Sequence, residues 1–406
     1  MIELRTFPYP YKAMLAISND IDNSPDLNVF LEIMDYLNSS KQTVFGNGLN
    51  LEVGNSFWFY NNTGTEQLSY FKGTSTAETN FAPHCGEFCQ SGFIDSIHTY
   101  GNFDSGGFKR KFALTARDEM GKYNVKLPVW INHGTHQNSQ NLGYVQGCYG
   151  GVQGHESYHA DLIKDFGIRY IWAGKMTHVL GQDAQNTLSV KGIQFLQNIT
   201  AKLKYKDEYE KIILSGNKLI APITLQDKTT LWEFQRWINA WGRQTVLDVN
   251  DFTQQIAKKN IRGLIRNEGF MVLYTHFCEN LKLKEGFPTK LKTNLRFIRE
   301  EYNSGELLVT TTSRLLRYKE ITIYIKTDVH EENGKTIFAI PSTMKTPLGK
   351  QNITLSDIEG LTFYTDEQEK TEIHFMGKCL ASKTNPRDHT GKVSISIPWI
   401  QLEYHR

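Results

Sequence analysis

The chain has 406 residues, of which 39% are hydrophobic and 22% are charged. This length exceeds what one ordinary hydrophobic core needs, so it predicts one large domain with a smaller one attached. The composition excludes a largely disordered chain. The 45 basic and 43 acidic residues give a formal net charge of +2, which argues against a nucleic-acid-binding protein.

The amino-terminal segment lacks the charged, apolar and small-residue order of a secretory signal. No apolar stretch approaches the roughly 20 residues that cross a bilayer. The five cysteines are scattered and odd in number, so they predict no disulfide framework. We therefore expect a cytoplasmic protein with reduced thiols and no membrane span, and an oligomer is left open.

The first predicted unit is a strand followed by a helix. The apolar run 13–17 ends in the polar segment 18–22, and a helix start follows at Ser24-Pro25-Asp26. Residues of the next stretch recur at helical spacing on one face: Leu27, Phe30, Leu31, Met34 and Leu37. Acidic residues thus stand where a strand ends and a helix begins, which is the usual place for a site in α/β folds.

The same unit recurs along the chain, with helices between short apolar strands. Such alternation predicts a parallel sheet, either a barrel or an open one. The expected strands are 57–60, 93–97, 129–131, 169–173 and 270–274, and the expected helices include 109–122, 155–166 and 291–302.

The character of the sequence changes after about Gly305. From about residue 320 onward, alternating apolar and polar residues are separated by turn-forming residues, as in ITIYIKTDV and VSISIPWIQLEY. This pattern predicts a smaller antiparallel β-domain of the sandwich type. We place the boundary between a domain of residues 1–318 and a β-rich domain of residues 319–406.

Two motifs early in the chain suggest metal-dependent chemistry. Asp20 and Asp22 would share one face of a strand, where one carboxylate can bind a metal and the other can act as a general base. The structural alternative is that Asp22 caps the following helix. His98, with Asn102 four residues later, would follow another strand and suits a divalent cation, or His98 is held by hydrogen bonds in a structural role.

Three later motifs also carry histidines. His133 and His136 follow the strand 129–131, where they would supply a ligand, an acid or a substrate contact, or form a polar loop. His276 follows the apolar strand 270–274, a position that suits a general acid. His155 and His159 satisfy the bare HExxH pattern of zinc proteases, but three glycines immediately before them place the pair in a first helical turn, which argues against a protease.

The order of these strand-end motifs resembles the polysaccharide deacetylase superfamily (NodB-like domains), in the Asp-x-Asp form of proteins from surface-polysaccharide clusters. The resemblance covers roughly residues 10–318 and implies an irregular (β/α) barrel with a divalent metal near the strand ends. The position of the family's second metal-binding histidine is held by Asn102. Either Asn102 ligates through its carbonyl oxygen, His133 or His136 replaces it, or the metal site is lost.

The resemblance implies a hydrolase that removes an acetyl or formyl group from the nitrogen of a sugar or surface-polysaccharide precursor, with a nucleotide sugar or other carbohydrate as substrate. The alternatives are a non-catalytic carbohydrate-binding or assembly protein and, third, a glycoside hydrolase. The expected cofactor is a divalent metal, zinc above all. We expect these roles: catalysis by Asp20 and His276, metal binding by Asp22, His98, Asn102 and His136, and substrate contacts by His133 and Trp172.

Overall fold

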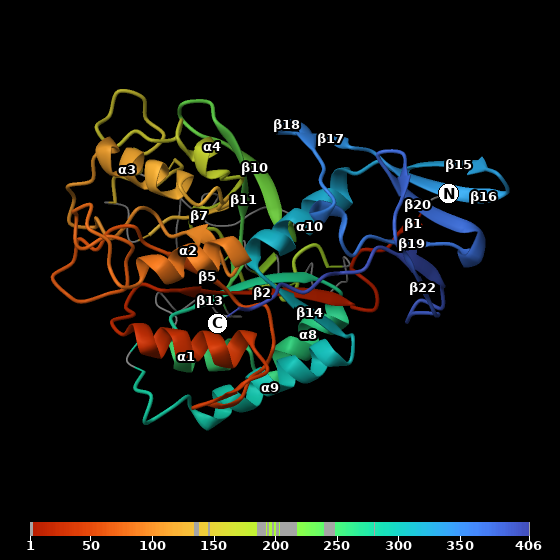
Figure 1. Cartoon of the computed structure of the whole chain (residues 1–406), viewed down its shortest axis with the longest axis horizontal. Helices are drawn as coiled ribbons and strands as arrows, with labels where there is room; N and C mark the ends of the chain where they lie inside the picture. Colours follow the sequence, from red (N-terminus) through yellow and green to blue (C-terminus); the bar gives the residue numbers. More distant parts are fainter. Residues whose placement is uncertain are drawn as a thin grey trace.

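The computed structural model describes residues 3–133, 138–144, 147–184, 217–238, 248–279 and 281–405, with the separate residues 192, 195, 196, 199 and 203. The chain forms a large α/β part and a smaller part built from the carboxy-terminal strands, which project from one end of the molecule (Figure 1). No helix among these residues is long and apolar enough to cross a membrane.

A mainly parallel sheet lies at the centre of the large part. Its strand order is β10-β11-β8-β7-β6-β5-β2-β13, and only the β10–β11 pair is antiparallel. β14 pairs with the first half of β2, and β5 pairs with its second half. The strands are β2 (Ala13–Asp20), β5 (Gly54–Phe57), β6 (Ile94–Ile97), β7 (Val129–Ile131), β8 (Tyr170–Trp172), β10 (Ile220–Thr224), β11 (Thr230–Phe234), β13 (Phe270–Thr275) and β14 (Leu307–Thr310).

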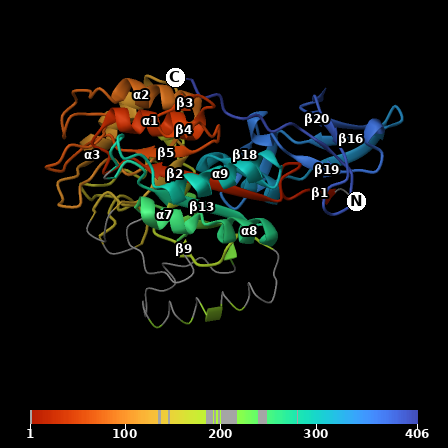
Figure 2. The same cartoon turned by 90° about the horizontal axis from the view of Figure 1, so that it is seen from below.

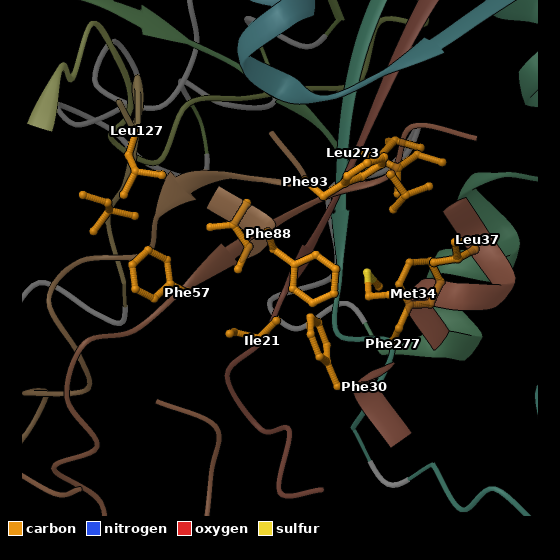
Figure 3. Packing of buried hydrophobic residues seen from close by; sticks show 14 of the residues in the cluster. Ile21, Phe30, Met34, Leu37, Phe57, Phe88, Phe93, Leu127, Leu273 and Phe277 are labelled. Carbon is orange, nitrogen blue, oxygen red and sulfur yellow. The ribbon is translucent and has the colours of Figure 1, made fainter. Parts of the chain in front are cut away.

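Helices cover this sheet and bury its apolar faces. Asp26 caps the first of them by accepting hydrogen bonds from the backbone N–H groups of Asn28 and Val29. Phe30 of that helix makes an edge-to-face contact with Phe88, with ring centroids 5.7 Å apart, inside the core shown in Figure 3. The helices are α1 (Leu27–Asn38), α2 (Ala82–Ser91), α3 (Arg110–Gly121), α4 (Ile163–Phe166), α7 (Val249–Gln255), α8 (Lys258–Asn267), α9 (Thr289–Asn303) and α10 (Thr312–Tyr324).

A buried ionic network holds α10 against the sheet. The Glu320 side chain is fully buried, and its carboxylate accepts hydrogen bonds from Arg169 Nε at 2.6 Å, Tyr170 Oη at 2.6 Å and Trp232 Nε1 at 2.8 Å. Arg317, one turn earlier on α10, adds a contact of 3.2 Å. The network fixes the helix relative to β8 and β11 because a buried carboxylate requires these partners.

The smaller part contains two four-stranded sheets, β1-β19-β23-β22 and β15-β16-β20-β21. Side chains from both sheets belong to one hydrophobic cluster, and Phe338 meets Phe363 with ring centroids 5.1 Å apart. The strands are β1 (Glu3–Leu4), β15 (Asp328–Glu332), β16 (Lys335–Ile340), β19 (Thr362–Tyr364), β20 (Thr371–Phe375), β21 (Lys378–Cys379), β22 (Lys383–Asn385) and β23 (Ser394–Ser396). Short hairpins complete the fold: β3 (Gln42–Thr43) with β4 (Gly46–Asn47), and β17 (Thr343–Thr346) with β18 (Gly349–Asn352).

Each end of the chain contacts the part of the molecule to which the other end belongs. β1 pairs with β19, so the first residues lie with the carboxy-terminal strands, as Figure 2 shows. In return, the backbone N–H of Leu402 donates to Glu52, and Tyr404 Oη donates to Asp35 on α1. α10 also continues past residue 318 to Tyr324. The boundary at 318/319 stays a prediction, and these contacts link the parts on either side of it.

Most predicted elements lie where the periodicity placed them, with exceptions. The pattern from residue 320 onward predicted only antiparallel strands, but α10 continues to Tyr324, and β16 and β20 pair in parallel. One helix is also shorter than expected. Residues 155–162 form turns, and only Ile163–Phe166 is helical. His155 Nδ1 accepts the backbone N–H of Ser157 at 3.1 Å, a local bond that competes with helix formation. The second strand is also displaced, to Gly54–Phe57.

Candidate functional site

The parallel strands bring four of the predicted side chains to one edge of the sheet. Asp22, His98, His133 and His276 follow β2, β6, β7 and β13, respectively, by one or two residues. β13 and β5 flank the carboxyl end of β2, and β6 and β7 continue the sheet beyond β5. Because carboxyl ends of parallel strands share one edge, residues 254 positions apart in the sequence become neighbours.

Asp22 lies among three histidines. Its Oδ1 is 3.2 Å from His276 Nε2 and 3.4 Å from His98 Nδ1, and its Oδ2 is 3.6 Å from His133 Nε2. All four residues are nearly or fully buried: the side chain of Asp22 is 7% exposed, and that of His133, the most exposed, is 14% exposed. Asp22 Oδ1 and His98 Nδ1 are buried and make no well-aligned hydrogen bond.

The charges of this cluster lower the pKa of Asp22 and raise the pKa of His133. Burial alone would raise the pKa of Asp22, but the charges of His276 and His98 hold it well below its usual range. Burial would lower the pKa of His133, but its hydrogen bonds to Asp104 and Asp22 raise that pKa to about 9. The cluster therefore favours an ionised Asp22 carboxylate beside a protonated His133.

Asp104 orients His133. His133 Nδ1 lies 3.3 Å from Asp104 Oδ1, and Asn138 Nδ2 donates to the same oxygen at 2.8 Å. This contact directs the other ring nitrogen, Nε2, toward Asp22. A carboxylate on the far nitrogen is the usual arrangement for a histidine that binds a metal. No sequence pattern points to Asp104, because it stands in the loop after Asn102 and follows no strand.

Asp20 occupies a separate polar environment. Its Oδ1 accepts a hydrogen bond from Ser56 Oγ at 2.7 Å, and its Oδ2 lies 3.3 Å from Arg236 Nη1. The guanidinium of Arg236 lies 4.4 Å from the ring centroid of Trp172 and 4.2 Å from that of Tyr274, and these two rings also contact each other, with centroids 5.8 Å apart. The side chains of Asp20 and Arg236 are each 1% exposed. Sequence reasoning missed Arg236, which belongs to the two-residue strand β12 (Arg236–Trp237).

The backbone around this edge is fixed by amide side chains. Asn19 Nδ2 donates to Asn55 Oδ1 at 3.0 Å, and Asn19 Oδ1 accepts from the backbone N–H of Phe277 at 3.0 Å. These buried bonds join the carboxyl ends of β2, β5 and β13. They hold the residue next to His276 against the strand that leads to Asp22.

Close backbone packing shapes the loop after His98. Thr99 has a φ of 53°, and Gly101 has a φ of 156° with its backbone against Tyr60. A Cβ at Gly101 would stand 2.2 Å from the Tyr60 carbonyl oxygen, so the position requires glycine. After this turn, Asn102 Oδ1 accepts the backbone N–H of Asp104 at 3.1 Å.

The predicted residues therefore separate into three groups. Asp22, His98, His133 and His276 meet, whereas Asp20 and Trp172 lie in the Arg236 environment. The Asn102 side chain accepts a hydrogen bond from the backbone of its own loop, at Asp104. His136 lies outside the described residues. The roles assigned to all these residues stay predictions.

The two histidines of the HExxH pattern, His155 and His159, contact different partners. His159 Nε2 lies 2.8 Å from the carbonyl oxygen of Gln140, and burial lowers the pKa of His159 to about 4. His155 stacks on Tyr149 with ring centroids 4.3 Å apart. The pair belongs to no shared helix, so the geometry does not support the protease alternative.

The donor set around Asp22 fits a divalent cation chemically. Carboxylate and imidazole are the ligands of catalytic zinc sites, and a buried carboxylate oxygen and a buried imidazole nitrogen here lack aligned hydrogen bonds. In the structure, the Asp22 carboxylate itself lies between the three histidines. Within the described part of the chain, the only trio of candidate ligand atoms that all lie within 4.8 Å of one another is Glu372, His374 and Cys379.

In comparisons with known proteins, no family model matches the chain, and no match was found among curated proteins or solved structures.

Proposed function

We propose that the protein is a metal-dependent hydrolase that removes an N-acyl group, acetyl or formyl, from a sugar or surface-polysaccharide precursor. The observation that carries this proposal is the separation of two buried aspartates into two environments, one among histidines and one beside an arginine. Two carboxyl groups at one strand end can then take two different roles.

Asp22, His98 and His133 are the residues that would hold the cation. The contact between Asp104 and His133 supports this choice, because it leaves His133 Nε2 directed at Asp22. A bound divalent ion such as zinc would lower the pKa of water and polarise the acyl carbonyl. The proposal therefore assigns His133 to metal binding, in place of Asn102, where the sequence predicted a substrate contact.

Asp20 would accept the proton from the attacking water. Ser56 donates a hydrogen bond to its carboxylate and Arg236 lies 3.3 Å from its other oxygen, so both would orient the group that acts as the base. His276 would donate a proton to the leaving amine, with its Nε2 near Asp22 and the backbone N–H of the next residue, Phe277, held by Asn19. This division assigns the proton acceptor and the proton donor to two different residues, Asp20 and His276.

We also propose that the large part is an irregular barrel and the small part a β-sandwich. Two pairings support the barrel: β9 (Met176–Thr177) runs parallel to β12, and Gln182 bridges Phe270 of β13. They connect the β8 side of the sheet to its β13 edge. The shared hydrophobic cluster of the two four-stranded sheets supports the sandwich.

The test is release of acetate or formate from N-acyl sugars and nucleotide sugars, by the chelated protein and after zinc or cobalt is added. Activity should depend on metal and should fall at least 100-fold in Asp22→Asn and His98→Ala. His155→Gln is the matched control, because His155 stacks on Tyr149 outside the cluster. Absence of release with any tested metal would sink the enzymatic proposal.

A non-catalytic carbohydrate-binding protein is the second candidate. It is favoured by the direct contacts of Asp22 with three histidines, which can neutralise the carboxylate without a cation. In that case a sugar would raise the melting temperature, and neither chelator nor Asp22→Asn would change the affinity for it. Metal-dependent turnover would exclude this candidate.

A further inference from the structure

We propose that Glu372, His374 and Cys379 form a second metal site, on the β20–β21 hairpin, that takes a thiophilic divalent cation such as zinc. Their candidate ligand atoms all lie within 4.8 Å of one another. The hairpin belongs to the small part of the molecule, apart from the sheet edge that carries Asp22 (Figure 1).

The hairpin fixes the positions of the three side chains. Met376 and Gly377 form its two-residue turn with φ values of 52° and 74°, and two positive φ values are typical of the tight type I′ turn. That turn pairs Phe375 with Lys378 and places His374 directly opposite Cys379. A directly opposite pair has Cβ atoms about 4.5–5.5 Å apart, so one small ion can reach both side chains.

Strand alternation brings the third ligand to the same face. Ile373 and Phe375 of β20 are buried in the core of the small part, whereas Glu372 and His374 are half-buried and face outward. His374 Nε2 lies 2.8 Å from Glu372 Oε2. Lys335 pairs with the other carboxylate oxygen, Oε1, at 2.5 Å. The ammonium opposes a cation electrostatically, but it also holds the carboxylate with Oε2 toward His374.

The ligand chemistry selects the class of cation. Thiolate, imidazole and carboxylate together are ligands of zinc and cobalt, and thiolate disfavours magnesium and calcium. Cys379 is the one exposed cysteine, since Cys85, Cys89, Cys148 and Cys278 are buried. Three protein ligands leave a position for water or for a ligand from another molecule.

Cobalt(II) titration of the full-length protein tests the site. A thiolate ligand gives a near-ultraviolet charge-transfer band, which should saturate with added cobalt and vanish in Cys379→Ser. His374→Gln should weaken cobalt binding at least tenfold, and Asp22→Asn should leave the band unchanged. This last result separates the hairpin site from the proposed catalytic site. A missing band, or a band that persists in Cys379→Ser, overturns the proposal.

His330→Gln is the matched control. His330 lies on β15 of the same sheet, 3.4 Å from Asp328 and 4.0 Å from Glu332, so it shares the carboxylate surroundings but has no thiol opposite it. The band should be unchanged in this variant. A second measurement uses the unmodified sequence: zinc should slow the reaction of the single fast thiol with a disulfide reagent at least tenfold, and an unchanged rate would refute binding at Cys379.

Discussion

Replacing Arg236 with methionine tests the environment assigned to Asp20. The substitution keeps an apolar stem beside Trp172 and Tyr274 but removes the guanidinium that lies 3.3 Å from Asp20 Oδ2. Asp20 would then remain buried, with hydrogen bonds from Ser56 and Ser18 on its other oxygen only. Removing one partner of a buried ion pair costs about 3–5 kcal/mol of unfolding free energy, and we expect a loss in this range.

A double-mutant cycle with Asp20→Asn isolates the pair. If the cost arises from the unpaired carboxylate, Asp20→Asn should recover part of the loss in the Arg236→Met background, with a coupling energy of about 2 kcal/mol. Arg236→Lys is the matched control: it keeps the charge but loses the planar stack, so it should be less destabilising than methionine.

Urea unfolding of the four proteins of the cycle gives these energies. Additivity within about 0.5 kcal/mol would refute the reasoning, because independent sites behave in that way. A stability of Arg236→Met within about 1 kcal/mol of the wild type would refute it as well.

Three further predictions concern buried or bridging carboxylates. Burial raises the pKa of Glu233 to about 7 from its ordinary value of 4.5, so the stability of the unmodified protein should fall as pH rises between these values. Glu233→Gln should be more stable than the unmodified protein at pH 8 by at most about 3 kcal/mol and equally stable near pH 4, as urea unfolding at both pH values will show. Asp104→Asn should weaken zinc binding, measured by calorimetry, by about 10–100-fold without unfolding the protein, because the His133 ring is then less firmly oriented. An unchanged zinc affinity would show that His133 is not a metal ligand. Glu320→Ala should cost about 3–5 kcal/mol in thermal or urea unfolding because it leaves Arg169 without its buried partner, and a cost below about 1 kcal/mol would contradict the network.

Strand-end polar residues were the part of the site that the sequence could predict. Asp22, His98, His133 and His276 each follow a short apolar run, and parallel pairing brings such positions to one edge of a sheet. The sequence could not say which histidines meet, because that depends on loop paths. The turn at Thr99 and Gly101, which directs Asn102 toward Asp104, has no periodic signature.

Arg236 and Asp104 could not be predicted because their partners are remote. Arg236 meets Asp20 across 216 positions of sequence, from a two-residue strand too short to show alternation. The change of pattern after Gly305 predicts a division into two parts, and its boundary at 318/319 stays a prediction, because β14 and α10, which follow Gly305, pack on the large sheet. The crossing of the chain ends, with β1 beside β19 and Tyr404 against α1, depends on tertiary contacts that no local pattern encodes.

Metal content tests the central claim most directly. The measurement is the zinc retained per chain after dialysis, in a Cys379→Ser background that removes the proposed hairpin site. The account predicts close to one equivalent in that background and close to none when Asp22→Asn is added, with His155→Gln unchanged. A protein that retains no zinc, or that retains it without the Asp22 carboxylate, would contradict the assignment of Asp22 as the centre of a metal site.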